Sequence, residues 1–281
     1  MTILAAIIMA LAAGLTEIYP VSGSGHLYIL AKLLGVPVGG AAFQSFRAML
    51  CFGVACSGVL YYRTQLFDTV RENLVLMGLL RPSGRQRGEP FGKRLGLLLL
   101  IAGLPMLPSL LMNRLRLRLE LGDYTLAYVG VLLCVSSVIL YFSTRSARGK
   151  RSIHQMTLSD ALFAGLIQVL SVFPGLSRTG LTLSVLLSRG LDGAAAAEFT
   201  GLMSIPAFLG AGIVQMSAAV SSGEALAAAP YLILGFALSA LTGYFTLRVF
   251  TNLMSFRRPT GFAYEGWGAA ILALILFLIS A

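Results

Sequence analysis

Long apolar stretches recur from one end of the chain to the other, and short polar segments separate them. A helix needs about 20 residues to cross the bilayer core. Some stretches reach roughly that length, and others are shorter and come in two pairs. The longer stretches predict six membrane-spanning helices, at residues 43–62, 95–112, 124–144, 197–221, 228–250 and 263–281.

The shorter stretches have the layout of hairpins that enter and leave the membrane from one face. Residues 1–12 and 27–36 flank one turn rich in Pro, Gly and Ser, and residues 158–173 and 181–188 flank another. Two interrupted segments at matching places in two halves of a membrane protein point to a binding site near the repeat interface.

These patterns together predict the fold class. We expect an all-α, polytopic membrane protein with about six spanning helices and two re-entrant helical hairpins in an inverted repeat. The whole chain, residues 1–281, is expected to form one integral membrane domain, with repeat halves at about 1–144 and 152–281.

Composition and charge agree with this class. Hydrophobic residues make up 57% of the chain and charged residues 11%, against about 25% charged in a soluble domain. The net charge is +10, but no basic stripe interleaved with aromatics indicates nucleic-acid binding. Basic residues concentrate in segments 63–94 and 145–151, which we interpret as loops on the inner side of the membrane. The hairpins then enter from opposite faces, although the basic loop 113–123 falls outside.

Both polar turns carry residue types that bind phosphate. Hydroxyl groups and close backbone N–H groups are typical of anion sites at helix N-termini, and Gly lets the backbone approach a ligand. Arg178 adds a planar, permanently charged fork that matches phosphate oxygens. The predicted substrate-binding residues are Ser22, Ser24, Gly25, Ser177, Thr179 and Thr182. Small residues of this kind also pack membrane helices, which is the structural alternative.

Ionisable residues inside the bilayer are functional candidates by default. Glu17 could bind a divalent cation, Mg or Ca, or act as a general base. His26 could be a nucleophile, a proton donor or a phosphate ligand, and Arg178 would stabilise charge on a transferring phosphoryl group. In the structural alternatives Glu17 caps a helix or pairs with Arg178, and His26 bonds to its own loop. Glu198 is either functional or paired with a loop arginine.

The two polar turns lie within two longer motifs. The first is Gly14-Leu-Thr-Glu-Ile-Tyr-Pro-Val-Ser-Gly-Ser-Gly-His26, and the second is Phe173-Pro-Gly-Leu-Ser-Arg-Thr-Gly-Leu-Thr182. Both resemble motifs of the BacA-type undecaprenyl-diphosphate phosphatases. The resemblance covers nearly the whole chain. It implies an enzyme of the bacterial inner membrane that removes the terminal phosphate of a polyprenyl diphosphate with a divalent cation, recycles the cell-wall lipid carrier, and forms a homodimer. It also implies catalytic Glu17, His26 and Arg178, with Glu17 as the metal ligand.

Two positions depart from the family's first motif. The family usually has a second acidic residue where this chain has Ala13, and a second adjacent serine where it has Gly23. A lone Glu17 would hold a cation more weakly than two carboxylates one helical turn apart. The departures favour an alternative function, a polyprenyl-phosphate transporter or flippase that does not hydrolyse its lipid.

Two other classes of membrane protein fit less well. Other lipid phosphatases with a Ser-Gly-His element need a second histidine after Ser-Arg, which this chain lacks. No carboxylate ring or carbonyl filter indicates a channel.

Overall fold

The computed structural model describes residues 1–81, 91–108, 125–146, 149–256 and 260–280. The named elements of these residues are all helices. The α-helices are α1 (Ile3–Thr16), α2 (Gly23–Leu33), α3 (Ala41–Tyr61), α4 (Arg63–Leu76), α5 (Phe91–Gly103), α7 (Thr125–Ser146), α8 (Leu158–Val169), α9 (Arg178–Ser188), α10 (Gly193–Ser221), α11 (Ala229–Phe256) and α12 (Gly261–Ser280). Two short 3-10 helices, η2 (Ile153–Gln155) and η3 (Leu170–Val172), precede and follow α8.

Within the described residues, five helices are long and apolar enough to cross a membrane: α3, α7, α10, α11 and α12. They correspond to five of the six predicted spans, and they confirm an all-α, polytopic membrane protein. The remaining predicted span, 95–112, begins within α5 but ends outside the described residues, as does the predicted loop 113–123.

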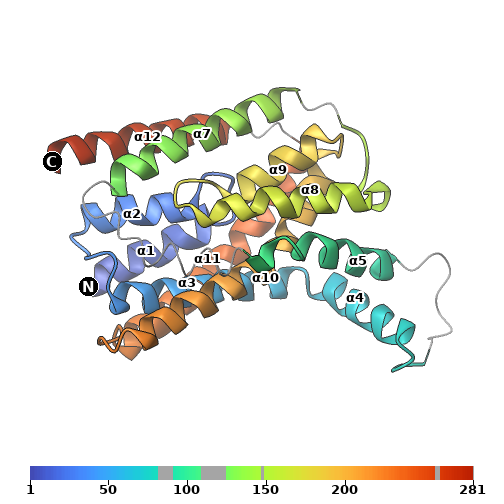
Figure 1. Ribbon diagram of the computed structural model, residues 1–281, viewed down its shortest axis with the longest axis horizontal. Coiled ribbons are helices and arrows are strands. Elements are labelled where there is room, and N and C mark those ends of the chain that lie inside the picture. The colour runs from blue at the N-terminus through green and yellow to red at the C-terminus, as the bar shows by residue number, and fades with distance from the viewer. Residues whose placement is uncertain (82–90, 109–124, 147–148, 257–259, 281) are drawn as a thin grey trace.

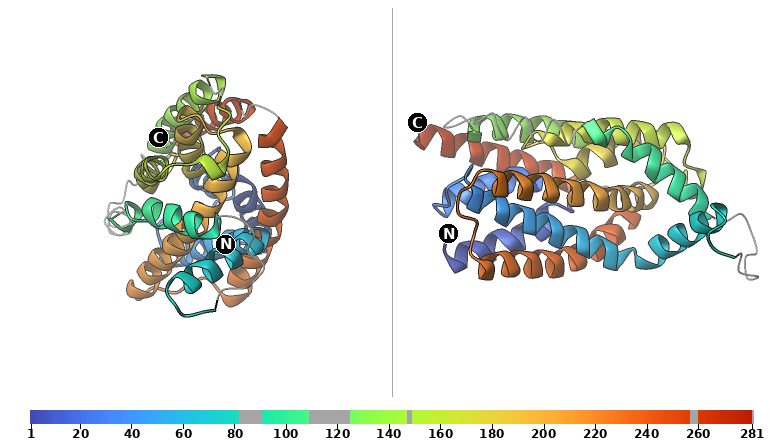
Figure 2. Two further views of the ribbon diagram at one scale, coloured as in Figure 1. Left: turned by 90° about the vertical axis from the view of Figure 1, so that its right-hand side faces the viewer. Right: turned by 60° about the horizontal axis from the view of Figure 1, so that its bottom comes forward.

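Helices α3, α10 and α11 form one group, and α7 and α12 form a pair on the other side of the hairpins (Figures 1 and 2). Helix α3 packs on both α10 and α11, α1 packs on α11, and α12 runs along α7. Small residues allow these close approaches, as is usual between membrane helices. A Cβ atom added to Gly14 of α1 would lie 2.8 Å from the main-chain nitrogen of Gly243 in α11, so this crossing requires glycine.

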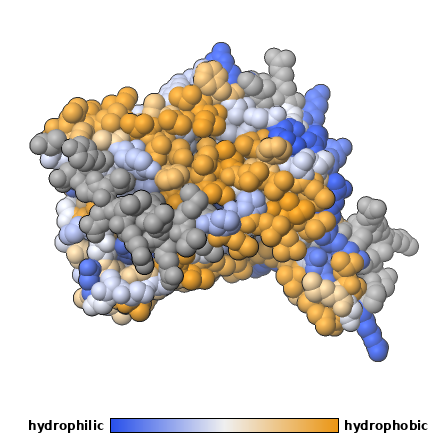
Figure 3. Space-filling model, viewed as in Figure 1, coloured by the Kyte–Doolittle hydropathy of each residue, from blue (hydrophilic) through white to orange (hydrophobic). Residues whose placement is uncertain are grey.

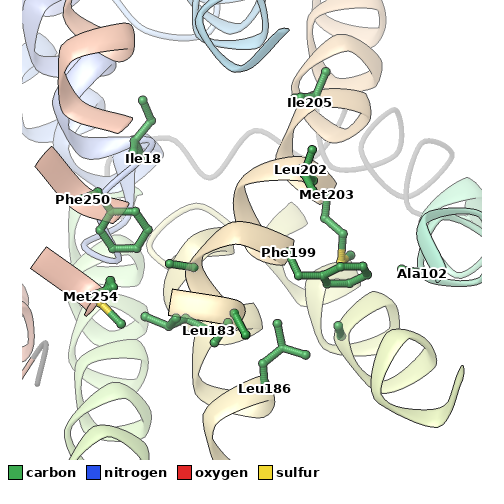
Figure 4. Close-up of a cluster of buried hydrophobic side chains, with 14 of the residues drawn as sticks. Ile18, Ala102, Leu183, Leu186, Phe199, Leu202, Met203, Ile205, Phe250 and Met254 are labelled. Atoms are coloured by element: carbon green, nitrogen blue, oxygen red, sulfur yellow. The ribbon is translucent and has the colours of Figure 1, made fainter. Parts of the chain in front are cut away.

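The largest buried cluster ties the second hairpin to the bundle (Figure 4). Leu183 and Leu186 of α9 belong to this cluster together with Phe199 of α10 and Phe250 of α11. All four side chains are almost completely buried. Ile18, from the turn after α1, joins this cluster. The apolar core therefore fixes both hairpins against one set of spanning helices.

Large apolar side chains also cover the outside of the bundle (Figure 3). Phe142 of α7, Ile213 of α10 and Phe245 of α11 are all exposed. Such a surface would be costly in water but suits contact with lipid chains. In the view of Figure 3, hydrophilic atoms gather mainly along the right-hand side.

The two predicted hairpins are present. Helices α1 and α2 form the first, and α8 and α9 form the second. Each helix is shorter than a full span, and the two hairpins lie toward opposite ends of the molecule in Figure 1.

The segment 63–94 differs from its predicted form. It is not a simple loop, because α4 occupies its beginning and α5 starts at Phe91. The basic residues alone predict a loop here. Apolar side chains recur every four residues, at Leu66, Val70 and Leu74, and this spacing stabilises an amphipathic helix despite the charges.

Candidate functional site

The first hairpin turns at the point where α1 ends. Glu17 is the C-cap residue of α1, and its N–H donates to the Ala13 carbonyl oxygen. After the turn, Ser22 adopts a left-handed conformation with φ of 67°, which is uncommon outside glycine. Its hydroxyl oxygen accepts a 3.3 Å hydrogen bond from the Gly25 N–H and caps α2. Ser22 is therefore buried in the turn as a helix cap.

In the second hairpin, a serine side chain caps the second helix in the same way. Ser177 is the N-cap of α9, and its hydroxyl oxygen accepts a 3.0 Å hydrogen bond from the Gly180 N–H. The preceding Gly175 has φ of 103°, and an added Cβ there would lie 2.7 Å from the Val129 carbonyl oxygen of α7. Only glycine satisfies both the backbone conformation and this close packing.

The two hairpin tips contact each other. The Thr179 hydroxyl donates a 3.0 Å hydrogen bond to the main-chain carbonyl oxygen of Glu17. A Cβ added to Gly180 would lie 3.1 Å from the Pro20 carbonyl oxygen. The N-terminus of α9 is thus held beside the end of α1.

A cavity of about 630 Å³ opens beside these tips. Most of its polar lining residues come from both hairpins and from α3 and α10, and we call this part of the cavity the polar end. Helix α4 and the segment from α5 to Leu107 provide mostly apolar lining residues, with Thr69 and Asn73 of α4 as polar exceptions. The polar end contains Glu17, Ser24, Arg47, Gln168, Ser171, Ser177, Arg178 and Gln215, and the apolar walls include Leu66, Val70, Met77, Leu99, Leu100, Leu104 and Leu107.

Several buried polar atoms at the polar end have no hydrogen-bond partner among the described residues. They are Arg47 Nε, Arg178 Nη1, Gln168 Nε2 and Gln215 Oε1. The Arg178 guanidinium lies 4.3 Å from the centre of the Phe208 ring, and its Nε donates weakly to Ser171 Oγ at 3.4 Å. Buried groups left unpaired are costly, so this end is suited to a ligand that pairs with them.

The family comparison agrees with this geometry. The family model described as "Bacitracin resistance protein BacA" matches residues 6–272. The chain belongs to the BacA family. Among its relatives, the undecaprenyl-diphosphatase of Alkaliphilus metalliredigens is 32% identical over 281 residues, covering 99% of this chain and 100% of the relative. That of Acidothermus cellulolyticus is 30% identical, covering 92% and 91%. That of Methanobrevibacter smithii is 32% identical, covering 99% and 98%.

The structure of this BacA-family chain brings together four of the predicted site residues. Glu17, Ser24, Ser177 and Arg178 all line the cavity. The other predicted binding residues do not line it, and all four of them form structural contacts. Thr179 joins the hairpins, and the Thr182 hydroxyl donates to Gln168 Oε1 at 3.4 Å. Ser22 and Gly25 form the cap of α2.

His26 is not among the residues that line the cavity. Its Nε2 lies 2.7 Å from Oε1 of Glu265 in α12, and its Nδ1 lies 2.9 Å from the Ser22 carbonyl oxygen. Since both neighbours accept hydrogen bonds, this arrangement suits an imidazolium that donates from both nitrogens. The bond to its own turn matches the structural alternative, and a catalytic role for His26 stays a prediction.

Glu198 also lies away from the cavity lining. Its carboxylate accepts a hydrogen bond from the Gln65 side chain of α4. The structural alternative, a loop arginine as its partner, is not seen among the hydrogen bonds of the described residues. This contact connects α4 to the beginning of α10.

The two departures from the family motif have structural counterparts. Ala13 is completely buried in the apolar cluster that includes Met9 and Phe46. A Cβ added to Gly23 would lie 2.7 Å from Oε1 of Glu17. The Glu17 carboxylate therefore occupies the space where a side chain at position 23 would begin.

Sequence reasoning missed Arg47, Gln215 and the apolar groove between α4 and α5. Arg47 lies inside the predicted span 43–62, and an ionisable residue at such a place is itself a sign of function. The groove could not be found in this way, because its α4 wall falls in the segment interpreted as a basic loop.

Asp160 anchors the open end of the second hairpin, outside the five spans. Its carboxylate accepts hydrogen bonds of 2.6 Å from Arg151 and 2.5 Å from Arg189, and another of 2.8 Å from the Thr157 N–H. Burial raises the pKa of Asp160, but these hydrogen bonds outweigh it and hold the pKa at about 2. The charged form thus fixes the start of α8 to the end of α9.

Proposed function

We propose that the chain is a polyprenyl-diphosphate phosphatase of the bacterial inner membrane, with undecaprenyl diphosphate as its substrate. The observation that carries the proposal is one cavity with two kinds of wall. Its cationic end matches a diphosphate headgroup, and its apolar end matches a polyprenyl chain. Membership of a family whose relatives are called undecaprenyl-diphosphatases supports the same substrate.

Arg178 and the N-terminus of α9 would bind the terminal phosphate. The guanidinium offers an unpaired Nη1, and the helix N-terminus favours an anion. Ser24 and Ser171 add hydroxyl groups at the same end. The arrangement would hold the phosphorus atom near the Glu17 carboxylate.

In the proposed reaction, a water molecule attacks the terminal phosphorus atom and transfers a proton to Glu17. The bond from phosphorus to the bridging oxygen breaks, and its electron pair remains on that oxygen. The products are inorganic phosphate and polyprenyl monophosphate. Arg178 stabilises the charge that develops on the phosphoryl oxygens.

The polyprenyl chain would lie in the groove between α4 and α5. Val70, Met77, Leu100, Leu104 and Leu107 line this groove and are exposed. Isoprene units lying against these side chains would gain van der Waals contacts along the length of the chain. The groove therefore contributes affinity for long chains, whereas the polar end determines the chemistry.

The predicted divalent cation finds few ligands in this cavity. Glu17 is the one carboxylate among the described residues that line it, and no group of three His, Cys, Asp or Glu residues gathers in the described part of the chain. Mg²⁺ and Ca²⁺ take six or more oxygen ligands. The donor set therefore does not fit a resident metal, and a cation would depend on substrate and water oxygens.

The proposal also includes the homodimer that the family resemblance implies. Light scattering on the detergent-solubilised protein tests it, with a mass of two chains as the expected result. A mass of one chain would contradict the dimer and leave the proposed reaction intact.

A second candidate function is transport of polyprenyl phosphate without hydrolysis. The two opposed hairpins meet through Thr179 and Glu17, as expected of a transporter with inverted repeats. Glu17 is the one carboxylate among the described lining residues, and this favours binding over cleavage. Reconstituted protein would then move the lipid between leaflets while phosphate release stays at background.

Phosphate release from undecaprenyl diphosphate by the purified protein tests the proposed function. Arg178→Ala and Glu17→Gln should each lower release by at least about 100-fold, the loss typical of removing a group that stabilises the transition state. His26→Ala tests its predicted catalytic role in the same assay. Absence of release in detergent and in liposomes, with and without divalent cations, would contradict the phosphatase.

A further inference from the structure

Arg47 of α3 places a second guanidinium at the polar end of the cavity. It is six residues from the start of a spanning helix, or about 9 Å along its axis. Only 7% of the residue is exposed. A charge at this depth is costly unless a partner compensates it.

Among the described residues, the Glu17 carboxylate attracts Arg47 but forms no close ion pair with it. The ion pairs found among them do not include Arg47, and its Nε has no hydrogen-bond acceptor. The guanidinium instead lies 5.4 Å from the centre of the Tyr28 ring and 5.7 Å from that of Phe43. The two rings hold it by cation–π attraction while its donors remain available.

Arg47 and Arg178 resemble each other in this respect. Each guanidinium lies against an aromatic ring, and each has a buried nitrogen without a partner. Both guanidinium groups interact electrostatically with the Glu17 carboxylate. Two cations and one anion leave a net positive charge, which an anionic headgroup would neutralise.

We propose that Arg47 is a second phosphate-binding arginine, which together with Arg178 clamps the diphosphate and supplies the positive charge that a divalent cation would otherwise supply. This proposal rests on the proposed function, because it names how the same cavity holds its headgroup. Guanidinium groups bind phosphate oxygens in a bidentate manner and stay charged at any working pH. Gln168 Nε2 adds a neutral donor.

The first test measures phosphate release from undecaprenyl diphosphate in excess EDTA. Wild-type protein should retain its activity, because its cations are side chains. Arg47→Gln should lower kcat/KM about 10- to 100-fold, as expected for losing hydrogen bonds to a charged group, and Arg47→Lys should recover part of the loss. Arg248→Gln is the matched control, since it removes one arginine from an exposed position on α11; it should stay within about twofold.

Stability distinguishes a ligand-binding role from a structural one. Without ligand, Arg47→Gln should melt at the wild-type temperature or above, because it removes a buried charge that has no close ion-pair partner. Added farnesyl diphosphate in EDTA should raise the melting temperature of the wild type and raise that of Arg47→Gln much less. A lower melting temperature with an unchanged ligand shift would overturn the binding role.

The outcomes separate the two proposals. If wild-type phosphate release disappears in EDTA and returns with Mg²⁺, the claim that the two arginines replace the metal is wrong. The proposed phosphatase activity would still stand. Unchanged kcat/KM in Arg47→Gln would overturn the clamp. If no condition gives phosphate release, the proposed function fails, and the shift with farnesyl diphosphate still decides whether Arg47 binds the headgroup.

Discussion

The Thr179 hydroxyl donates a 3.0 Å hydrogen bond to the main-chain carbonyl oxygen of Glu17, although the two residues are 162 positions apart. The bond joins the tip of one re-entrant hairpin to the tip of the other. It fixes the main chain of the proposed general base relative to the helix that carries Arg178. The proposed catalytic geometry therefore depends on how the hairpins dock.

Thr179→Val should disturb this docking while keeping the side-chain shape. The Glu17 carbonyl oxygen would lose its partner, and we expect about 1 kcal/mol less stability. We also expect kcat to fall about tenfold, because the Glu17 carboxylate would no longer be held in place. Thermal unfolding and phosphate release measure the two effects.

Thr246→Val is the control for this substitution. Thr246 is also buried, but its hydroxyl donates to the Thr242 carbonyl oxygen within α11. It should lower stability without a comparable loss of kcat. Equal losses of kcat in both variants would argue against a specific role for the contact between the hairpins.

Adding a side chain at Gly23 should displace Glu17. A Cβ there would lie 2.7 Å from Glu17 Oε1, so Gly23→Ser should lower kcat about tenfold even though it restores the family's serine. Gly268→Ser, at an exposed position of α12 with open space around it, should have no effect. A gain of hydrolysis in Gly23→Ser, alone or with Ala13→Glu, would show that these two positions limit catalysis instead.

Filling the groove should discriminate against long chains. Gly103 lines the cavity and has no neighbouring atom within 4 Å of an added Cβ, so Gly103→Phe can extend into the space proposed for the polyprenyl chain. The ratio of kcat/KM for undecaprenyl diphosphate to that for farnesyl diphosphate should fall about tenfold. An unchanged ratio would place the lipid chain elsewhere, and Gly268→Phe controls for bulk alone.

Stability should depend on Asp160 in acid. Its pKa is lowered from 3.8 to about 2, so its contribution is complete above about pH 4 and is lost as the pH falls toward 2. Asp160→Asn should lower stability by about 2 kcal/mol at neutral pH, since it removes hydrogen bonds between charged groups. The difference in melting temperature between wild type and variant should shrink from pH 5 to pH 2. A constant difference would rule out the charged carboxylate as its source.

The sequence predicted the hairpins because their turns interrupt apolar stretches with Pro, Gly and Ser. It placed Glu17 and Arg178 correctly at the tips. It grouped His26 with Ser24 because they are neighbours in the chain. In a helix, however, each residue turns by about 100°, so a residue two positions on points away. Ser24 thus lines the cavity, whereas His26 pairs with Glu265.

The missed features depend on packing that the sequence does not display. Arg47 sits in an otherwise apolar stretch, and only the tertiary structure brings it to the hairpin tips. The apolar wall of α4 was hidden by the basic residues around it. In both cases the helical face, and not the local composition, decides the role.

The central claim is that the cavity between the hairpins cleaves the terminal phosphate of a polyprenyl diphosphate. The most direct measurement is phosphate release from undecaprenyl diphosphate by the purified, unmodified protein, compared with Arg178→Ala. We expect catalytic release by the wild type and at least about a 100-fold loss in the variant. Background release by the wild type, together with movement of polyprenyl phosphate across reconstituted membranes, would contradict the claim and establish a transporter.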